Sequence, residues 1–140
     1  MTPGQQREAD EAVVAGRRAL ASLEEAEDAL ESASNWGAFD LFLGGAISSV
    51  IKHVRLGGAR EALERARDDL YAFTRELRDV SDIEVLRMDV GALATTLDVL
   101  FDNVFVDLYV QKKIDDARDN VAAAIRATRV VLARLEETPR

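Results

Sequence analysis

Three aspartates lie in an otherwise apolar stretch, and they are the residues of this sequence best suited to chemistry. The stretch covers residues 97–110 and contains Asp98, Asp102 and Asp107. A carboxylate is costly to bury unless it is paired, hydrogen-bonded or bound to a metal, and helical bundles can hold metals with carboxylates that point inward. One hypothesis is therefore a divalent-metal or small-molecule site. The other is a buried polar network with two exposed acids.

The spacing of these aspartates limits a metal site. At about 100° per residue, Asp98 and Asp102 are about 40° apart on a helix, whereas Asp107 is about 180° from Asp98 and falls on the apolar seam. A continuous helix therefore cannot bring all three to one ion. With one histidine and no cysteine, the chain lacks the ligands of the usual zinc and di-iron sites. An all-oxygen site for magnesium, calcium or manganese remains, and we expect no cofactor.

His53 is the only histidine of the chain. It lies four residues after Ser49, just as Gln111 lies four residues after Asp107. If a repeat relates the two halves of the chain, these four residues meet in one inward polar patch. We predict a hydrogen bond between His53 and Asp107 there, which would orient the imidazole and neutralise the carboxylate. A purely structural role for His53 is the alternative.

The residues argue against an enzyme. An acid–base pair of His53 and Asp107 would still need a nucleophile. Ser48 and Ser49 are nearby, but neither lies in a Gly-x-Ser-x-Gly elbow. The glycine-rich loops that bind phosphates are also missing from the sequence. We therefore favour a protein without catalytic activity, and an enzyme is kept as a third reading because the placement of the aspartates and the histidine is unusual.

The elements that must position these residues are helices. The chain of 140 residues has prolines only at positions 3 and 139, and Ala, Leu, Arg, Glu and Asp dominate it, as in long helices. The net charge of −8 argues against a nucleic-acid partner, because phosphates need a basic face. No secretory leader is visible, and the most apolar run, Trp36 to Ile51, is shorter than the roughly 20 residues of a membrane span. We expect a cytoplasmic protein.

Apolar residues at heptad spacing predict four or five helices. Thr2 and Pro3 form a favourable start for the first one. Gly37 and the pair Gly57-Gly58 are expected to break the chain on either side of a short apolar helix. Ser81 and Glu84 match a capping box at the start of the fourth helix. The expected helices cover residues 3–34, 39–54 and 59–79, a segment that begins near 82, and residues 114–137.

Each long helix carries one apolar stripe. The stripes comprise Ala9, Ala12, Val13, Gly16, Ala19, Leu20, Leu23, Ala26, Leu30 and Ala33; Ala59, Leu63, Ala66, Leu70, Phe73, Leu77 and Val80; Ile83, Leu86, Val90, Leu93, Leu97, Leu100 and Val104; and Ile114, Ala117, Val121, Ala124, Thr128, Val131 and Leu135. These stripes predict a single all-α domain over residues 1–140, an elongated coiled-coil bundle of antiparallel hairpins with halves 1–80 and 81–140. Because the first stripe consists mostly of small residues, a second copy could pair with it, and we expect self-association or another protein partner.

The two halves of the chain align when Asp40 is placed on Asp98 and Leu56 on Ile114. The same alignment places Ala59-Arg60 on Ala117-Arg118. An internal duplication with a pseudo-two-fold axis would explain this match. Chance alignment of two heptad helices is the alternative.

Part of the sequence resembles a family of uncharacterised bacterial all-helical coiled-coil proteins. The resemblance covers roughly residues 34–118 and is carried by Trp36-Gly37, Asp40, Gly44-Gly45, Lys52-His53, Phe101-Asp102, Asp107 and Lys113-Ile114. It implies a helical fold and draws attention to this region, but it implies no activity.

Three aromatic residues and seven polar ones are therefore the candidates for function. Trp36, Phe39 and Phe42 have the helical spacing that is typical of a core, and a partner-facing surface is the alternative reading. The sequence favours a non-catalytic structural or protein-interaction module. The alternative is a module that binds a small molecule or a divalent metal near the apolar end, with Asp40, His53, Asp98 and Asp107.

Overall fold

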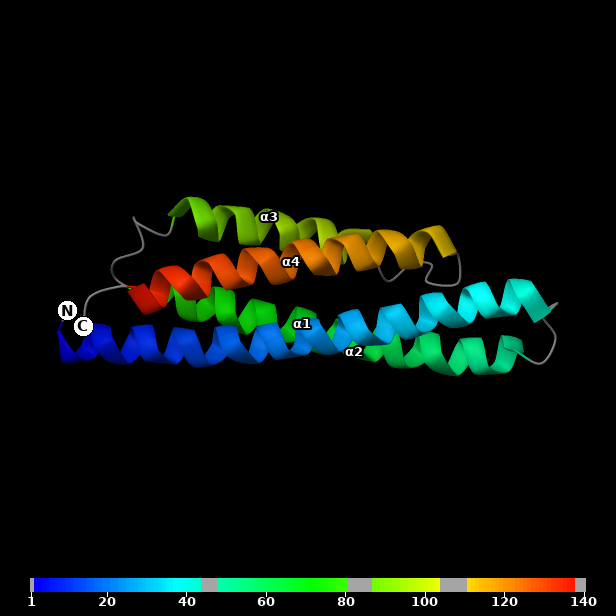
Figure 1. The fold of residues 1–140 in the computed structure, drawn as a ribbon. Coiled ribbons are helices and arrows are strands. Elements are labelled where there is room, and N and C mark those ends of the chain that lie inside the picture. Colours follow the sequence, from blue (N-terminus) through cyan, green and yellow to red (C-terminus); the bar gives the residue numbers. More distant parts are fainter. Residues whose placement is uncertain (1, 44–47, 81–86, 104–110, 138–140) are drawn as a thin grey trace.

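In the part of the chain that the structure describes, four helices run alternately up and down as a bundle (Figure 1). The computed structural model describes the backbone of residues 2–43, 48–80, 87–103 and 111–137, and the side chains of residues 2–32, 58–80, 87–98 and 114–137. Helix α1 covers Pro3–Leu43, α2 covers Ser48–Asp79, α3 covers Arg87–Asn103 and α4 covers Gln111–Glu137. Helix α1 packs against α2 and α4, whereas α3 packs mainly against α4 and only lightly against α2. The expected all-α fold is confirmed.

Helix α1 begins where the sequence predicts. The backbone nitrogen of Thr2 donates a hydrogen bond to Gln5 Oε1 (2.8 Å), and the backbone nitrogen of Gln5 donates one to Thr2 Oγ1 (3.2 Å). This reciprocal arrangement is a capping box, in which each side chain satisfies a backbone donor that the first turn leaves without a partner. Pro3 occupies the first helical position, where its missing N–H has no cost.

The expected breaks at Gly37 and at Gly57-Gly58 are wrong. Helix α1 continues to Leu43, and α2 runs without a break from Ser48 to Asp79. A glycine inside a helix costs only about 1 kcal/mol relative to alanine, which packing between two long helices readily offsets. The separate apolar helix expected over residues 39–54 is therefore divided between the end of α1 and the start of α2.

The predicted stripes form the core. Every member of the stripes on α2 and α4 is buried, and so are most members of the stripe on α1. Leu20 and Val90 are only partly buried, and Leu93 and Leu97 attach α3 to the rest of the core. Ala33, Ile83, Leu86, Leu100 and Val104 lie outside the part of the chain whose side chains are described.

Helix α1 lies close to both of its neighbours at Gly16. A Cβ atom at this position would lie 2.6 Å from Leu132 Cδ2 on α4 and 2.8 Å from Phe73 Cε1 on α2. The small residues of α1 thus admit two helices of the same chain rather than one helix of another copy. This removes the reason for which we expected α1 to pair with a second molecule.

Candidate functional site

The residues of the predicted polar patch fall largely outside the described side chains. Ser49 and His53 belong to the first turns of α2, and Gln111 is the first residue of α4. Asp107 lies outside the described residues altogether. The structure describes the side chain of none of these four residues. The hydrogen bond between His53 and Asp107 therefore stays a prediction.

Polar pairs between helices show which turns lie at the same level of the bundle. On α1 and α4, Arg17 pairs with Glu136 (2.7 Å) and Glu24 pairs with Arg129 (3.3 Å), so both helices advance by the same amount in opposite directions. If this alignment continues, the first turn of α4 lies beside the last turns of α1. Gln111 is thereby level with the segment of α1 that contains Asp40.

The alignment of α1 with α2 brings His53 to the same region. Ser22 on α1 donates a hydrogen bond to Asp69 on α2, and Glu25 pairs with Arg65 (3.2 Å). Continued toward the start of α2, this alignment places the backbone of His53 about one helical turn from the level of Asp40. The backbone of Asp40, Ser49, His53 and Gln111 thus lies toward one end of the bundle, and a meeting of their side chains stays a prediction.

Asp98 does not belong to that end. It is exposed on α3, where the ion pair between Asp89 and Arg134 (3.2 Å) aligns α3 with α4. This alignment puts Asp98 level with Ile125 of α4. The level of Asp40 lies about twelve residues further toward the start of α4. At about 1.5 Å per residue, the two levels are about 18 Å apart along the bundle. One ion or small ligand could not contact both carboxylates. A metal site at this end would therefore have to form without Asp98.

Other predicted residues remain without a structural test. Asp40, Trp36, Phe39 and Phe42 lie in the last turns of α1, and Asp102 lies near the end of α3, but their side chains are outside the described part. Among the residues that the structure describes, no group of three or more His, Cys, Asp or Glu side chains could hold a metal ion.

A prediction remains for the polar patch. If His53 and Asp107 are paired, Asp107→Ala leaves the imidazole without its partner, and the free energy of unfolding should fall by more than 1 kcal/mol, as on loss of a buried hydrogen bond to a charged group. Urea unfolding measures this change. A loss within about 0.5 kcal/mol, which is typical of a surface residue, would reject the pairing.

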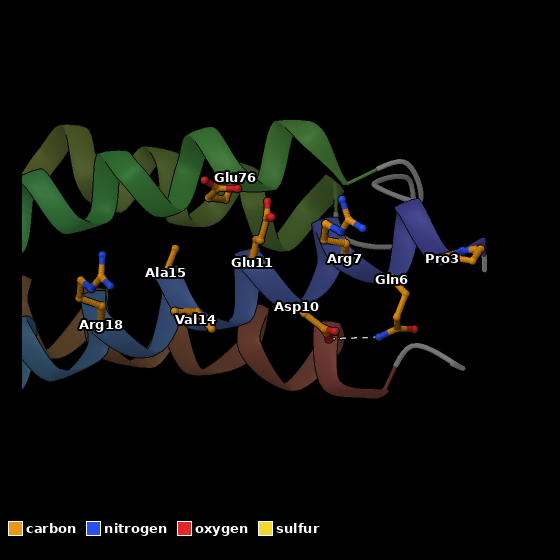
Figure 2. Close-up of a pocket in the computed structure, with 9 residues that line it drawn as sticks. All are labelled: Pro3, Gln6, Arg7, Asp10, Glu11, Val14, Ala15, Arg18 and Glu76. Atoms are coloured by element: carbon orange, nitrogen blue, oxygen red, sulfur yellow. Dashed lines mark hydrogen bonds between the residues drawn. The ribbon is translucent and has the colours of Figure 1, made fainter.

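An open groove of about 590 Å³ lies on the outer face of α1, near its N-terminal end. Figure 2 shows that Glu76 of α2 faces this part of α1 and that Gln6 Nε2 donates a hydrogen bond to Asp10 Oδ1 (3.1 Å). Val14 in the groove remains 59% exposed. The lining residues are Pro3, Gln6, Arg7, Asp10, Glu11, Val14, Ala15, Arg18 and Glu76.

The groove is poorly suited to a small molecule. Its two arginines are set against three carboxylates, so it offers no single charge to a ligand. It is also open to solvent, whereas a small-molecule site usually buries roughly 70–90% of its ligand. The sequence did not single out these residues, because alternating charges on the solvated face of a helix carry no signal of a site.

The outer face of α3 carries few charges. Charged residues make up more than half of the exposed positions on the described parts of α1, α2 and α4, whereas α3 has no charged residue between Asp89 and Asp98. Met88 is 89% exposed, more than any other large apolar side chain described. We define the α3 outer face as the exposed residues Arg87, Met88, Gly91, Ala92, Ala94, Thr95 and Asp98.

Hydrogen bonds within α3 make this surface less polar than its composition indicates. Thr95 Oγ1 donates to the carbonyl oxygen of Gly91 (3.0 Å), and Thr96 Oγ1 donates to that of Ala92 (2.8 Å). Both hydroxyl protons are therefore used inside the helix. A Cβ at Gly91 would meet nothing within 4 Å, so the middle of the surface is open to a close approach by another backbone.

Comparison with known proteins gives no further guide. No family model, curated protein or solved structure matches this chain. The resemblance to uncharacterised bacterial helical proteins therefore stays a prediction. The function has to be argued from the chain's own residues.

The sequence contained one signal for the α3 outer face. The eight residues from Val90 to Leu97 include no charge, although the chain as a whole is 31% charged. Heptad spacing explains only the inward members of this run, Val90, Leu93 and Leu97. Heptad spacing gives no reason for the lack of charge at the residues between them, and the sequence analysis did not single these residues out as a surface.

Proposed function

We propose that this protein is a non-catalytic helical module that binds another protein through the α3 outer face. The observation that carries the proposal is the contrast between this face and the other described helix surfaces, which are densely charged. Protein interfaces are poor in charge at their centre and polar at their rim. Small uncharged residues flanked by Arg87 and Asp98 have this arrangement.

The interior supports a structural role for the rest of the bundle. Among the described residues, Thr128 is the one buried polar side chain, and its Oγ1 donates to the carbonyl oxygen of Ala124 (2.7 Å) within α4. The described core is otherwise apolar. It therefore acts as a rigid support that holds the surface of α3 in place.

We further propose that the partner is a protein rather than a nucleic acid and that the module works in the cytoplasm. The net charge of −8 supports the first point, because the phosphate backbone would be repelled. The absence of cysteine is compatible with a reducing compartment. Of the described helices, none combines the length and the apolar character needed to cross a membrane.

Site-specific photocrosslinking in the cells that make the protein tests the proposal. A photoreactive residue in place of Thr95 should give a discrete crosslinked product, because this position would lie inside the interface. The same residue in place of Glu64, which is exposed on α2, is the matched control and should give much less. Equal products at both positions, or none at Thr95, would reject the α3 outer face as a binding surface.

A further inference from the structure

We propose that the α3 outer face binds a second copy of this chain, with the two α3 helices antiparallel across a two-fold axis near residue 93. This inference rests on the proposed function and names the partner. It is carried by the spacing of the exposed residues of α3, by the charges at the two ends of the face and by the hydrogen bonds of its threonine.

The exposed residues of α3 have the spacing of a second helix seam. Met88, Gly91, Thr95 and Asp98 are separated by three, four and three residues. At about 100° per residue they lie within a sector of about 80°, on the side of α3 that faces away from the buried Leu93 and Leu97. In Figure 1, α3 lies along the upper edge of the bundle, and α4 lies between it and α1. A partner helix can therefore reach this seam without disturbing the bundle.

The middle of the seam allows two backbones to approach closely. Gly91 has no side chain, and the hydroxyl proton of Thr95 is already donated to the Gly91 carbonyl oxygen. An antiparallel copy with its axis near residue 93 sets Gly91 of one molecule opposite Thr95 of the other. Small residues at such positions permit close helix contact.

The charges at the ends of the face are complementary under the same symmetry. A two-fold contact is self-complementary, so each contact occurs twice. Antiparallel pairing brings Arg87 of each copy beside Asp98 of the other, which makes two ion pairs. Neither residue has an ion pair within the described part of the chain.

The same charges argue against a partner of uniform charge. A basic partner would be attracted to Asp98 and repelled by Arg87, and an acidic partner would meet the reverse. The face has one charge of each sign, placed on either side of the proposed axis. A second copy in antiparallel orientation satisfies both at once.

The dimer should be weak and reversible. The contact is centred on one helix, and small interfaces are typical of transient association. The net charge of −8 on each copy also opposes association. We expect a dissociation constant on the order of 100 µM, which corresponds to a weak complex.

Charge exchange tests the pairing, with sedimentation equilibrium over about 10 to 500 µM protein as the readout. The variants Arg87→Asp and Asp98→Arg each create two like-charge contacts in a homodimer, and each should weaken association by about tenfold. An equimolar mixture of the two variants restores both opposite-charge pairs in the heterodimer, and association should return to the wild-type level. Arg87→Asp places a negative charge at the start of α3 and Asp98→Arg a positive charge toward its end, and both agree with the helix dipole. Neither variant should therefore unfold the chain, and circular dichroism checks this.

A matched pair of variants away from α3 serves as the control. Arg18→Asp on α1 and Glu64→Arg on α2 exchange the same charges at exposed positions. Alone or mixed, they should leave the dissociation constant within about twofold of wild type, as expected for charges outside an interface.

The outcomes separate this inference from the proposed function. Wild-type protein that stays monomeric at about 500 µM overturns the second copy as partner. A dimer that is insensitive to the exchanges, or that the mixture does not restore, overturns the antiparallel pairing. A crosslink from position 95 to a different protein also overturns it, while the binding role of the α3 outer face stands. Absence of any crosslink at that position, both in cells and with purified protein at about 500 µM, rejects the binding role itself.

Discussion

At the scale of single residues, two buried positions test how the core is packed. Gly16 lies where α1 meets both α2 and α4, and an added methyl group would collide with Phe73 and Leu132. Thr128 is completely buried, but its hydroxyl group is satisfied inside its own helix. Position 16 has no room for a larger side chain, and the hydroxyl group at position 128 makes its hydrogen bond inside α4 rather than with another helix.

Replacement of Gly16 by alanine should therefore destabilise the protein, although alanine favours a helix. The gain in helix propensity is about 1 kcal/mol, whereas overpacking costs about 1–3 kcal/mol, and the buried ring of Phe73 has little room to move. We expect a net loss of roughly 1 kcal/mol for Gly16→Ala and a larger loss for Gly16→Leu, measured by urea unfolding. A stabilised Gly16→Ala would show that the three helices are further apart at this level.

Replacement of Thr128 by valine should be neutral or should stabilise the protein by up to about 1 kcal/mol. Valine keeps the branched shape and loses only a hydroxyl group whose hydrogen bond stays within α4. Thr128→Ala is the contrasting variant, because it also removes a buried methyl group and should cost about 1 kcal/mol. A marked loss with valine would mean that the hydroxyl group has a partner on another helix.

At the scale of the elements, the length of a helix depends on its neighbour as much as on its own residues. Helices α1 and α2 pass through glycines that we expected to break them. The two helices pack against each other, with contacts such as Ser22 with Asp69 and Glu25 with Arg65. A local preference of about 1 kcal/mol is small against this packing.

Gly58→Ala tests whether α2 is continuous at its predicted break. A Cβ at Gly58 would meet nothing within 4 Å, and the residue is helical and exposed. Alanine should therefore stabilise the protein by roughly 0.5–1 kcal/mol through helix propensity alone. This is the opposite sign from the change expected at Gly16. A loss of stability at Gly58 would indicate that the chain turns there and needs a glycine.

At the scale of the whole molecule, the part of the core that the structure describes is covered by helices of one chain. The stripe of α1 is covered by α2 and α4 of the same molecule, as the surroundings of Gly16 show. Among the side chains that the structure describes, four ion pairs on the surface join different helices. Such pairs contribute little to stability individually, but they agree in orientation with the antiparallel packing.

Thermal unfolding should therefore be independent of protein concentration in dilute solution. If the core needs no second chain, the midpoint should stay within about 1 °C between about 1 and about 20 µM, because a weak dimer is barely populated in that range. Circular dichroism melting curves at the two concentrations measure this. A midpoint that rises clearly with concentration would mean that a second chain completes the core.

Heptad spacing alone predicted the fold class and most of the core, because the inward stripe of an amphipathic helix is a local property. The stripes on α2 and α4 are buried at every predicted position, and Thr2 caps α1 as expected. The tertiary structure decided which helices cover α1 and showed that the glycines at 37 and 57–58 do not end helices. It also showed that Asp98 is exposed to solvent, at a different level of the bundle from Asp40. These depend on contacts between residues distant in sequence, whose energies outweigh local preferences. The α3 outer face, whose middle is uncharged, became distinct only when the fold showed which side of that helix is left without a neighbour in the described part of the chain.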